Sequence, residues 1–532
     1  MNKTHSRMPV VNALFVSALF LQGFWVSQAM ADVATTNFYT LDTAKHFQVM
    51  DNFGANDAWS IQKIGAEWSE TNKNKIAELL FSTNNGIGLS GWRFNLGAGI
   101  NHRTIHDDWR TTESFETMAG KYDWTRQVGQ RWFLRAAKAL GVDEFAATVY
   151  SPPLRLTRNG LSNSGGDTNS TTNLKPGAEA AFAQYLSDVL RHFRDNSDPS
   201  ERVDFNYLLP VNEPQWEWQQ SQEGCRAANA DLKSIFTALH ARLEAEHLRT
   251  KILGPESGSI PDMYSLDVPA SEKWHADYGD YLNWICGNPE IAAVFGGVIS
   301  YHSYWSDDVE TQLVPCRAAL GRAFAQHPGW RIWQSEYCIM ETGRDLGMDT
   351  ALRVARVIHF DLTLVNASSW QWWSAVANED FKSGLIYTDY KSPGDAETIY
   401  ESKLLWTLGN FSRFIRPGMV RVELSGTQDV NGLMASAFLD EKSRRMVLIF
   451  VNCADAAKNV WLQFARPADE GRLFKTYITS VDKNLAPGQE IFNPKILVVP
   501  ARSVVTLVSE PGLSKNGSSE TAVLNYDKIL KD

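Results

Sequence analysis

Phe205-Asn206-Tyr207-Leu208-Leu209-Pro210-Val211 is a largely apolar run that leads directly into Asn212-Glu213-Pro214. A second such run, Arg331-Ile332-Trp333-Gln334-Ser335, leads into Glu336-Tyr337. Short runs without strict alternation are typical of strands in a parallel sheet that is covered on both faces. In such folds the functional side chains gather where the strands end. We therefore expect Glu213 and Glu336 to lie at one end of a common parallel sheet.

Eight strand-like segments alternate with helical stretches along most of the chain. This alternation predicts βα units, and eight of them predict a (β/α)₈ TIM barrel, an α/β fold. In this count Glu213 follows the fourth strand and Glu336 follows the seventh, so both carboxylates would project into one mouth. The expected strands cover residues 49–54, 91–96, 144–150, 205–211, 251–254, 297–301, 331–335 and 368–373.

The intervening helices have start and stop signals of their own. Asp123 is a candidate N-cap for a helix that runs to Leu140, before Gly141, and Pro176 suits the first turn of the next helix. Further helices are expected over 225–247, over 349–366 and, closing the barrel, over 399–414. In the first of these helices a recurrence every four residues predicts one apolar face, made of Trp124, Val128, Trp132, Ala136 and Leu140.

The pattern changes after Arg416-Pro417-Gly418. Apolar segments at 445–451, 495–499 and 504–508 predict an antiparallel β-sandwich domain. We expect a catalytic barrel over 32–415, of which 32–46 can pair with the β-domain, a β-sandwich over 416–510 and a flexible tail over 511–532. The β-domain either covers one flank of the barrel, which we favour, or binds polysaccharide.

The N-terminus has the features of a secretory signal peptide. Lys3 and Arg7 precede an apolar stretch over 10–26, and Ala29-Met30-Ala31 is a small-residue cleavage site. Cleavage after Ala31 predicts a secreted or periplasmic protein. The apolar stretch is short for a membrane span, and no later segment is long and apolar enough to be one.

Composition narrows the class of protein further. The chain has 532 residues, 44% of them apolar, with a formal net charge of −10 and 19 tryptophans. A spread acidic balance argues against nucleic-acid binding, which needs a basic surface. The five cysteines allow at most two disulfides, among them Cys225–Cys286, and show no metal-binding spacing. We expect no metal, no cofactor and a monomer.

The two glutamates together predict a reaction type. A retaining glycosidase uses one carboxylate as nucleophile and a second as general acid and base, with the two carboxyl groups about 5–5.5 Å apart. Aromatic and amide residues flank both glutamates, including Trp216 and Trp218 beside Glu213. A carboxylate-only mechanism of this kind needs no metal.

Six motifs in a fixed order support the same interpretation: Asp51-Asn52-Phe53-Gly54-Ala55, Trp92-Arg93-Phe94-Asn95-Leu96-Gly97-Ala98-Gly99, Asn212-Glu213-Pro214, His302-Ser303-Tyr304, Ser335-Glu336-Tyr337, and the segment from Leu408 to Gly418. With these motifs, nearly all of the chain after residue 31 resembles glycoside hydrolase family 30. The resemblance implies a retaining enzyme in which Glu213 is the acid/base and Glu336 the nucleophile.

The resemblance also implies substrate contacts. Asn212 resembles the asparagine that binds the sugar 2-hydroxyl, and Asp57 the carboxylate that accepts hydrogen bonds from the sugar at the cleavage site. Trp373 resembles the aromatic floor of that subsite, with Trp370 or Trp372 as barrel packing. Beside these, we expect Arg93 to keep the nucleophile ionised, Tyr304 to donate a hydrogen bond to it, and His302 to orient a hydroxyl or the nucleophile.

The substrate prediction depends on two segments. Ser151-Pro152-Pro153-Leu154-Arg155 lacks the tryptophan that many exo-acting members carry here, and 53–60 is most similar to the endo-β-1,6-galactanase branch. We therefore expect β-1,6-galactan, such as arabinogalactan side chains. The alternatives are β-1,6-glucan, xylan or an exo-cleaved β-galactoside or β-fucoside. A non-enzymatic carbohydrate-binding protein would lack a catalytic carboxylate, and both are present.

Overall fold

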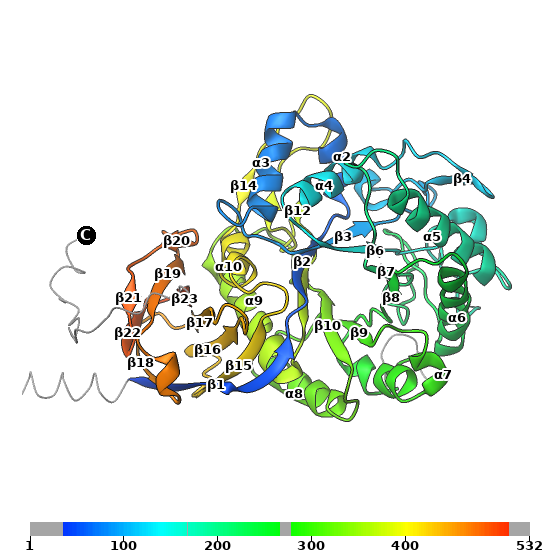
Figure 1. Ribbon diagram of the computed structural model, residues 1–532. Coiled ribbons are helices and arrows are strands. Elements are labelled where there is room, and N and C mark those ends of the chain that lie inside the picture. Colours follow the sequence, from blue (N-terminus) through cyan, green and yellow to red (C-terminus); the bar gives the residue numbers. More distant parts are fainter. Residues whose placement is uncertain (1–35, 168, 267–277, 510–532) are drawn as a thin grey trace, which may run out of the picture.

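The computed structural model describes residues 36–167, 169–266 and 278–509, and its centre is a barrel of eight parallel strands (Figure 1). Their order is β8-β7-β6-β3-β2-β11-β10-β9. Bridges Ile252–Phe295 and Ser257–Tyr301 join β8 to β9 and close the barrel. The strands are β2 (Asn52–Asn56), β3 (Gly91–Asn95), β6 (Glu144–Thr148), β7 (Tyr207–Leu209), β8 (Lys251–Ile252), β9 (Val298–His302), β10 (Arg331–Glu336) and β11 (Ser369–Trp372). The TIM-barrel prediction is confirmed.

Helices surround the barrel, as Figure 1 shows. They bury apolar faces against strands that are themselves buried on both sides, which is why the strand sequences are continuously apolar. The α-helices are α2 (Ser60–Glu67), α3 (Glu70–Phe81), α4 (Val128–Ala139), α5 (Glu179–Arg194), α6 (Asn229–Ala245), α7 (Pro289–Ala292), α8 (Leu313–Phe324), α9 (Met348–Phe360) and α10 (Lys403–Ser412). Single turns of 3-10 or π-helix are η1 (Asp108–Arg110), η2 (Leu154–Leu156), η3 (Pro261–Met263), η5 (Leu282–Cys286), η6 (Asp361–Val365) and η7 (Pro467–Asp469).

Helix α4 corrects two expectations. It begins at Val128 and not after Asp123, because Asp123 accepts from Thr125 in a local turn and Gln127 has a left-handed backbone, φ 53°. The predicted apolar face is also wrong, since Val128 and Leu140 are 53% and 41% exposed. A repeat of four residues drifts around a helix of 3.6 residues per turn. The buried side chains of α4 are Gln130, Phe133, Leu134 and Ala137.

Two other helix ends also differ from expectation. Pro176 precedes α5, which begins at Glu179 because Gly177 is left-handed, φ 74°. Helix α9 ends at Phe360 and continues as the π-helical turn η6 to Val365, where left-handed Asn366 ends it. The shared cause is a left-handed residue, which no α-helix can continue through.

The second part of the molecule is one ten-stranded sheet in the order β20-β19-β23-β17-β16-β15-β1-β18-β22, with β21 beside β19. Only β1 and β18 pair in parallel. Both halves of this sheet contribute to one core, which includes Tyr39, Phe450 and Leu497. The strands are β1 (Asn37–Val49), β15 (Val420–Gly426), β16 (Leu433–Leu439), β17 (Met446–Asn452), β18 (Lys458–Phe464), β19 (Leu473–Thr479), β20 (Ala486–Pro487), β21 (Ile491–Phe492), β22 (Ile496–Val499) and β23 (Ser503–Ser509).

Strand β1 connects the two parts. It pairs with β15 and β18 and then leads into barrel strand β2 (Figure 1). Helices α9 and α10 lie between barrel and β-domain, where Asn410 Nδ2 donates to Thr506 Oγ1 at 2.9 Å. Smaller sheets are β4 (Glu116–Met118) with β5 (Lys121–Tyr122), and β12 (Val376–Ala377), β13 (Ile386–Tyr387) and β14 (Tyr400–Glu401).

Some expectations concern other parts of the chain. The signal peptide, its cleavage site and the tail over 511–532 lie outside the described residues, and the domain limits stay predictions. Within the described residues no helix is long and apolar enough to cross a membrane. All five cysteines are free thiols, so the Cys225–Cys286 pair does not form.

Two substitutions test which face of α4 is buried against the barrel. Phe133→Ala removes a fully buried ring and should lower the free energy of unfolding by about 3–5 kcal/mol. Val128→Ala changes an exposed side chain and should stay within about 0.5 kcal/mol of the parent. Urea unfolding measures both. Equal losses in the two variants would contradict the orientation of α4 described here.

Candidate active site

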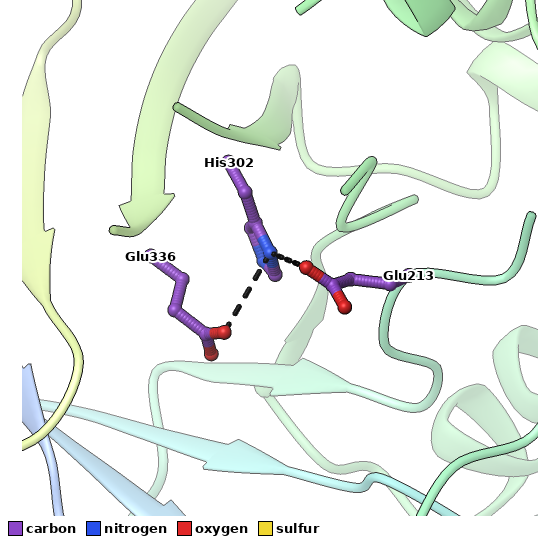
Figure 2. Close-up of side chains that lie close together, drawn as sticks. All are labelled: Glu213, His302 and Glu336. Atoms are coloured by element: carbon purple, nitrogen blue, oxygen red, sulfur yellow. Dashed lines mark hydrogen bonds and ion pairs between the residues drawn. The ribbon is translucent and has the colours of Figure 1, made fainter. Parts of the chain in front are cut away.

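Glu213 and Glu336 meet at the C-terminal mouth of the barrel (Figure 2). Glu336 is the last residue of β10, and Glu213 is the fourth residue after the end of β7. The backbone of Glu213 is left-handed, with φ 44°. One carboxylate oxygen of each lies within 4.8 Å of the other, and both lie within that distance of a His302 ring nitrogen. The two residues are 5% and 4% exposed. Tertiary folding therefore brings together the two carboxylates that the sequence singles out.

His302, at the end of β9, lies between the two carboxylates (Figure 2). Its Nδ1 is 2.9 Å from Glu213 Oε1 and 3.7 Å from Glu336 Oε1. Burial by itself would lower the pKa of His302, but the Glu336 charge and the hydrogen bonds to Glu213 and Glu256 raise it to about 10. The ring is therefore an imidazolium at neutral pH, and both of its nitrogens donate.

Two further donors face Glu336. The Tyr304 hydroxyl donates to Oε1 at 2.9 Å, and Arg93 Nη1 lies 3.4 Å from Oε2. Burial raises the pKa of Glu336 to about 6, while His302 and Arg93 act to lower it. Donors and positive charges next to a carboxylate favour its ionised form. The contacts expected for Arg93 and Tyr304 are thus present.

Glu256 is a member of this cluster that sequence reasoning missed. Its carboxylate accepts from Arg93 Nη2 at 2.9 Å, from Ser335 Oγ at 2.7 Å and from His302 Nε2 at 3.1 Å. It is fully buried, and Arg93 and His302 overcome the effect of burial and lower its pKa to about 2. The signal was available, since Glu256 follows the apolar run of the fifth strand as Glu213 follows that of the fourth.

A cavity of about 370 Å³ opens beside the two glutamates. Among the predicted substrate contacts, Asn212, Tyr304 and Trp373 line it. Trp370 and Trp372 are fully buried and pack in the barrel. The other lining residues are Trp59, Arg110, Tyr150, Trp216, Trp218, Gln222, Trp305, Cys338, Met340, Glu379, Phe381 and Ser383.

Asp57 differs from its expected place. It is fully buried and is not among the residues that line the cavity. Its Oδ1 accepts from the backbone N–H of Asn95 at 2.8 Å, and burial raises its pKa to about 8. A neutral acid beneath the wall is poorly placed to accept hydrogen bonds from a sugar. Direct substrate contact by Asp57 stays a prediction that this burial disfavours.

The Glu213, His302 and Glu336 cluster has the residue types of a metal site but not its chemistry. A metal ion needs a neutral imidazole with a free lone pair. The His302 ring is cationic and both nitrogens face carboxylates. Arg93 is a further positive charge next to Glu336. Both His302 nitrogens are engaged by the carboxylates of Glu213 and Glu256, and this arrangement suits proton transfer at the mouth.

A TIM barrel with paired carboxylates at its mouth is the architecture of an O-glycosyl hydrolase. The profile of O-glycosyl hydrolase family 30 matches residues 37–387. The chain belongs to this family, as its motifs predicted.

Relatives agree with this assignment. The glucuronoxylanase XynC of Bacillus subtilis is 24% identical over 390 residues, which are 71% of this chain and 77% of XynC. The crystal structure of a conserved exported protein from Bacteroides fragilis is 31% identical, with a TM-score of 0.79, and the match covers 88% of this chain and all of that one. An endo-β-1,6-glucanase structure shares the fold at 15% identity and a TM-score of 0.63, over 88% and 93% of the two chains.

The contacts of Glu256 predict a positioning role. In Glu256→Gln the His302 ring loses a charged partner, so its pKa should fall below about 10 by one unit or more. We expect kcat for hydrolysis to fall at least about tenfold with little change in KM, because Glu256 does not line the cavity. NMR titration of the His302 ring measures the first effect.

Glu223→Gln is the matched control for this experiment. Glu223 is 1% exposed and accepts from the backbone of Thr112, and burial raises its pKa to about 8. A neutral amide should therefore replace it with little effect on His302. If His302 titrates identically in Glu256→Gln and in the parent, the positioning role is wrong.

Proposed function

We propose that this protein is an exported retaining glycoside hydrolase that cleaves β-1,6-galactan through a covalent glycosyl-enzyme. One observation carries the mechanism: oxygens of the Glu213 and Glu336 carboxylates lie within 4.8 Å of each other. Retaining enzymes hold the two carboxyl groups about 5–5.5 Å apart, whereas inverting enzymes leave about 6.5–9.5 Å for a water molecule. The short distance between the two oxygens supports the retaining arrangement.

The neighbours of each glutamate support their roles. Glu336 accepts a hydrogen bond from the Tyr304 hydroxyl and faces the Arg93 guanidinium. Both contacts stabilise the anion that a nucleophile needs to be. Glu213 has His302 as its charged neighbour and lies at the start of the loop that continues to Trp216. In the first step Glu336 attacks C1, the C1–O bond breaks, and Glu213 gives its proton to the leaving oxygen. Water then attacks C1, the bond between C1 and Glu336 breaks, and the water gives a proton back to Glu213.

Charge is conserved through this cycle. Arg93 and His302 carry positive charge, and Glu256 is a permanent anion. With Glu336 ionised and Glu213 protonated, the buried charges of these five groups balance. In the glycosyl-enzyme Glu336 is a neutral ester and Glu213 is ionised, so the balance is unchanged. A site closed off from water favours a reaction of this kind, because no net charge appears in it.

The cavity wall favours a neutral sugar. Among the described lining residues Arg110 is the only basic one, and its guanidinium is paired with Glu379 at 2.8 Å. A glucuronate side group would need a free cation at that wall. This pairing, with the sequence resemblance to the β-1,6-galactanase branch, supports a neutral galactan as substrate. The same mechanism on xylan is the alternative that the XynC similarity favours, and β-1,6-glucan or an exo-cleaved β-galactoside or β-fucoside completes the alternatives.

Product analysis tests the substrate. We expect the full-length enzyme to release a ladder of oligosaccharides from β-1,6-galactan and little from β-1,6-glucan, glucuronoxylan or aryl glycosides. NMR of the first product should show the β-anomer. Monosaccharide as the sole product would overturn the endo assignment, and an α-anomer would overturn the two-step mechanism.

Two matched amide substitutions test the roles of the glutamates. Glu336→Gln should abolish hydrolysis of polysaccharide and of a β-glycosyl fluoride alike. Glu213→Gln should lose about 10²–10⁴-fold on polysaccharide yet still react with the fluoride, because fluoride leaves without a proton. Intact-mass spectrometry would then detect glycosyl-enzyme in Glu213→Gln alone. The reverse pattern would exchange the two roles.

The pH profile follows from the pKa of Glu336. Only the ionised nucleophile attacks, so the rising limb of kcat/KM with pH should have its midpoint at about 6. Tyr304→Phe removes a donor to the ionised form and should move this limb to higher pH. Initial rates on a soluble oligosaccharide measure both curves. A limb that moves to lower pH in Tyr304→Phe would contradict the role given to this hydroxyl.

A further inference from the structure

The aromatic residues of the cavity fall into two groups on opposite sides of the mouth. One group follows β2 and β11, where Trp59 and Trp373 pack edge to face with ring centroids 4.9 Å apart. The other follows β7 and β9, which lie two to four places away from β2 and β11 around the eight-stranded barrel. Its members, which we call the Trp305 shelf, are Trp216, Trp218 and Trp305.

Trp305 is the open member of the shelf. Its side chain lines the cavity and the residue is 55% exposed, one of the largest exposed fractions among the apolar residues described. The Trp216 ring packs edge to face against the Trp305 ring, with their centroids 5.5 Å apart. The Tyr304 ring is tilted against the Trp305 ring, with their centroids 5.6 Å apart. The Trp305 backbone is left-handed, φ 53°. Such a conformation is costly for a bulky residue and is found mainly at functional sites.

The other two members are held against the loop of Glu213. Trp218 Nε1 donates to the Glu213 carbonyl oxygen at 3.0 Å, and the Trp216 backbone N–H donates to the same oxygen at 3.1 Å. Two glycines leave room for the indoles. A Cβ at Gly224 would lie 2.3 Å from the Trp218 ring, and one at Gly258 would lie 2.1 Å from Trp216 Nε1. Two of the three shelf residues are thus fixed on the loop that carries the acid/base Glu213.

The role of Glu213 as general acid indicates on which side of the cavity the leaving group binds. A general acid must lie beside the oxygen that it protonates, which is the leaving-group oxygen. Trp216 and Trp218 share one loop with Glu213, and Trp305, which follows β9, packs against Trp216. The shelf therefore flanks the leaving group, and the Trp59–Trp373 pair flanks the sugar that becomes attached to Glu336. This inference rests on the proposed function and adds a second sugar position to it.

We propose that the Trp305 shelf binds the pyranose ring on the leaving-group side of the cleaved bond. The C–H groups of one face of a pyranose carry slight positive charge and are attracted to the negative face of an indole. Gln222, which also lines this side, supplies an amide for sugar hydroxyls without a charge. The shelf therefore selects a neutral sugar over water and over small alcohols as the group that leaves or arrives at C1.

Partitioning of the glycosyl-enzyme tests this site without involving polysaccharide. β-Galactosyl, β-glucosyl and β-xylosyl fluoride serve as donors: the C1–F bond breaks, Glu336 bonds to C1 and fluoride leaves. Glu213 gives its proton to solvent as fluoride departs. An acceptor hydroxyl then attacks C1, the bond between C1 and Glu336 breaks, and the hydroxyl proton passes to Glu213. Methyl β-D-galactopyranoside is an acceptor that reaches the shelf, and methanol is one too small to do so. For each acceptor, the measured quantity is the ratio of transfer product to hydrolysis product.

Trp305→Ala should lower the ratio of sugar transfer to hydrolysis about tenfold and leave the ratio of methanol transfer to hydrolysis within twofold. Trp305→Phe keeps an aromatic face and should recover most of the sugar transfer. Trp461→Ala is the matched control, because Trp461 is 43% exposed in β18 of the β-domain, away from the cavity lining.

Four results would overturn the proposal. Sugar transfer unchanged in Trp305→Ala, or an equal fall in sugar and methanol transfer, would show that the shelf does not bind the arriving sugar. An equal fall in Trp461→Ala would show that the effect is not local. If intact-mass spectrometry detects no glycosyl-enzyme with any of the three fluorides, the proposed function itself fails, and the shelf fails with it.

Discussion

The active-site mouth depends on one buried ion cluster, in which Glu256 holds the two cations that face Glu336. Arg93 and His302 both donate to its carboxylate, and both lie within 4 Å of Glu336. A buried charge without a partner is strongly unfavourable, and removal of one partner exposes the others to that cost. Glu213 completes the set through His302. The five groups come from β3, the β7 and β8 ends, β9 and β10, so they assemble only when the barrel closes.

The same cluster explains the backbone at the mouth. Glu213 and Glu256 are both left-handed, φ 44° and 59°, a conformation that costs about 1–3 kcal/mol unless the surroundings impose it. Here the Glu213 N–H donates to the Glu256 carbonyl oxygen at 2.9 Å, and the Glu256 N–H donates to Ser300 Oγ at 3.3 Å. Each strand end thus holds the next in place. The acid/base loop that carries Trp216 and Trp218 begins from this rigid point, which connects the ion cluster to the proposed sugar shelf.

Much of the barrel was predictable because its signals are local. The eight strands are buried on both faces, so their apolar runs marked them to within a few residues, and the residues that follow these runs marked the mouth. Helix α4 was less predictable, because Gln127 turns left-handed and delays the start of the helix to Val128. Burial of Phe133 and exposure of Val128 depend on which face of α4 meets the barrel, and a spacing of four residues fits either choice.

The sequence by itself determined the fold class, the family and the pair Glu213 and Glu336, since these follow from short motifs and strand periodicity. Only the tertiary structure decided which residues surround these two glutamates. Glu256 is part of the site because β8 lies between β7 and β9 in the closed barrel. The Asp57 carboxyl group is fully buried, where its Oδ1 accepts from the Asn95 backbone and from the Gln130 amide. Electrostatic partners act across a few ångströms of space, and distance along the chain does not encode that proximity.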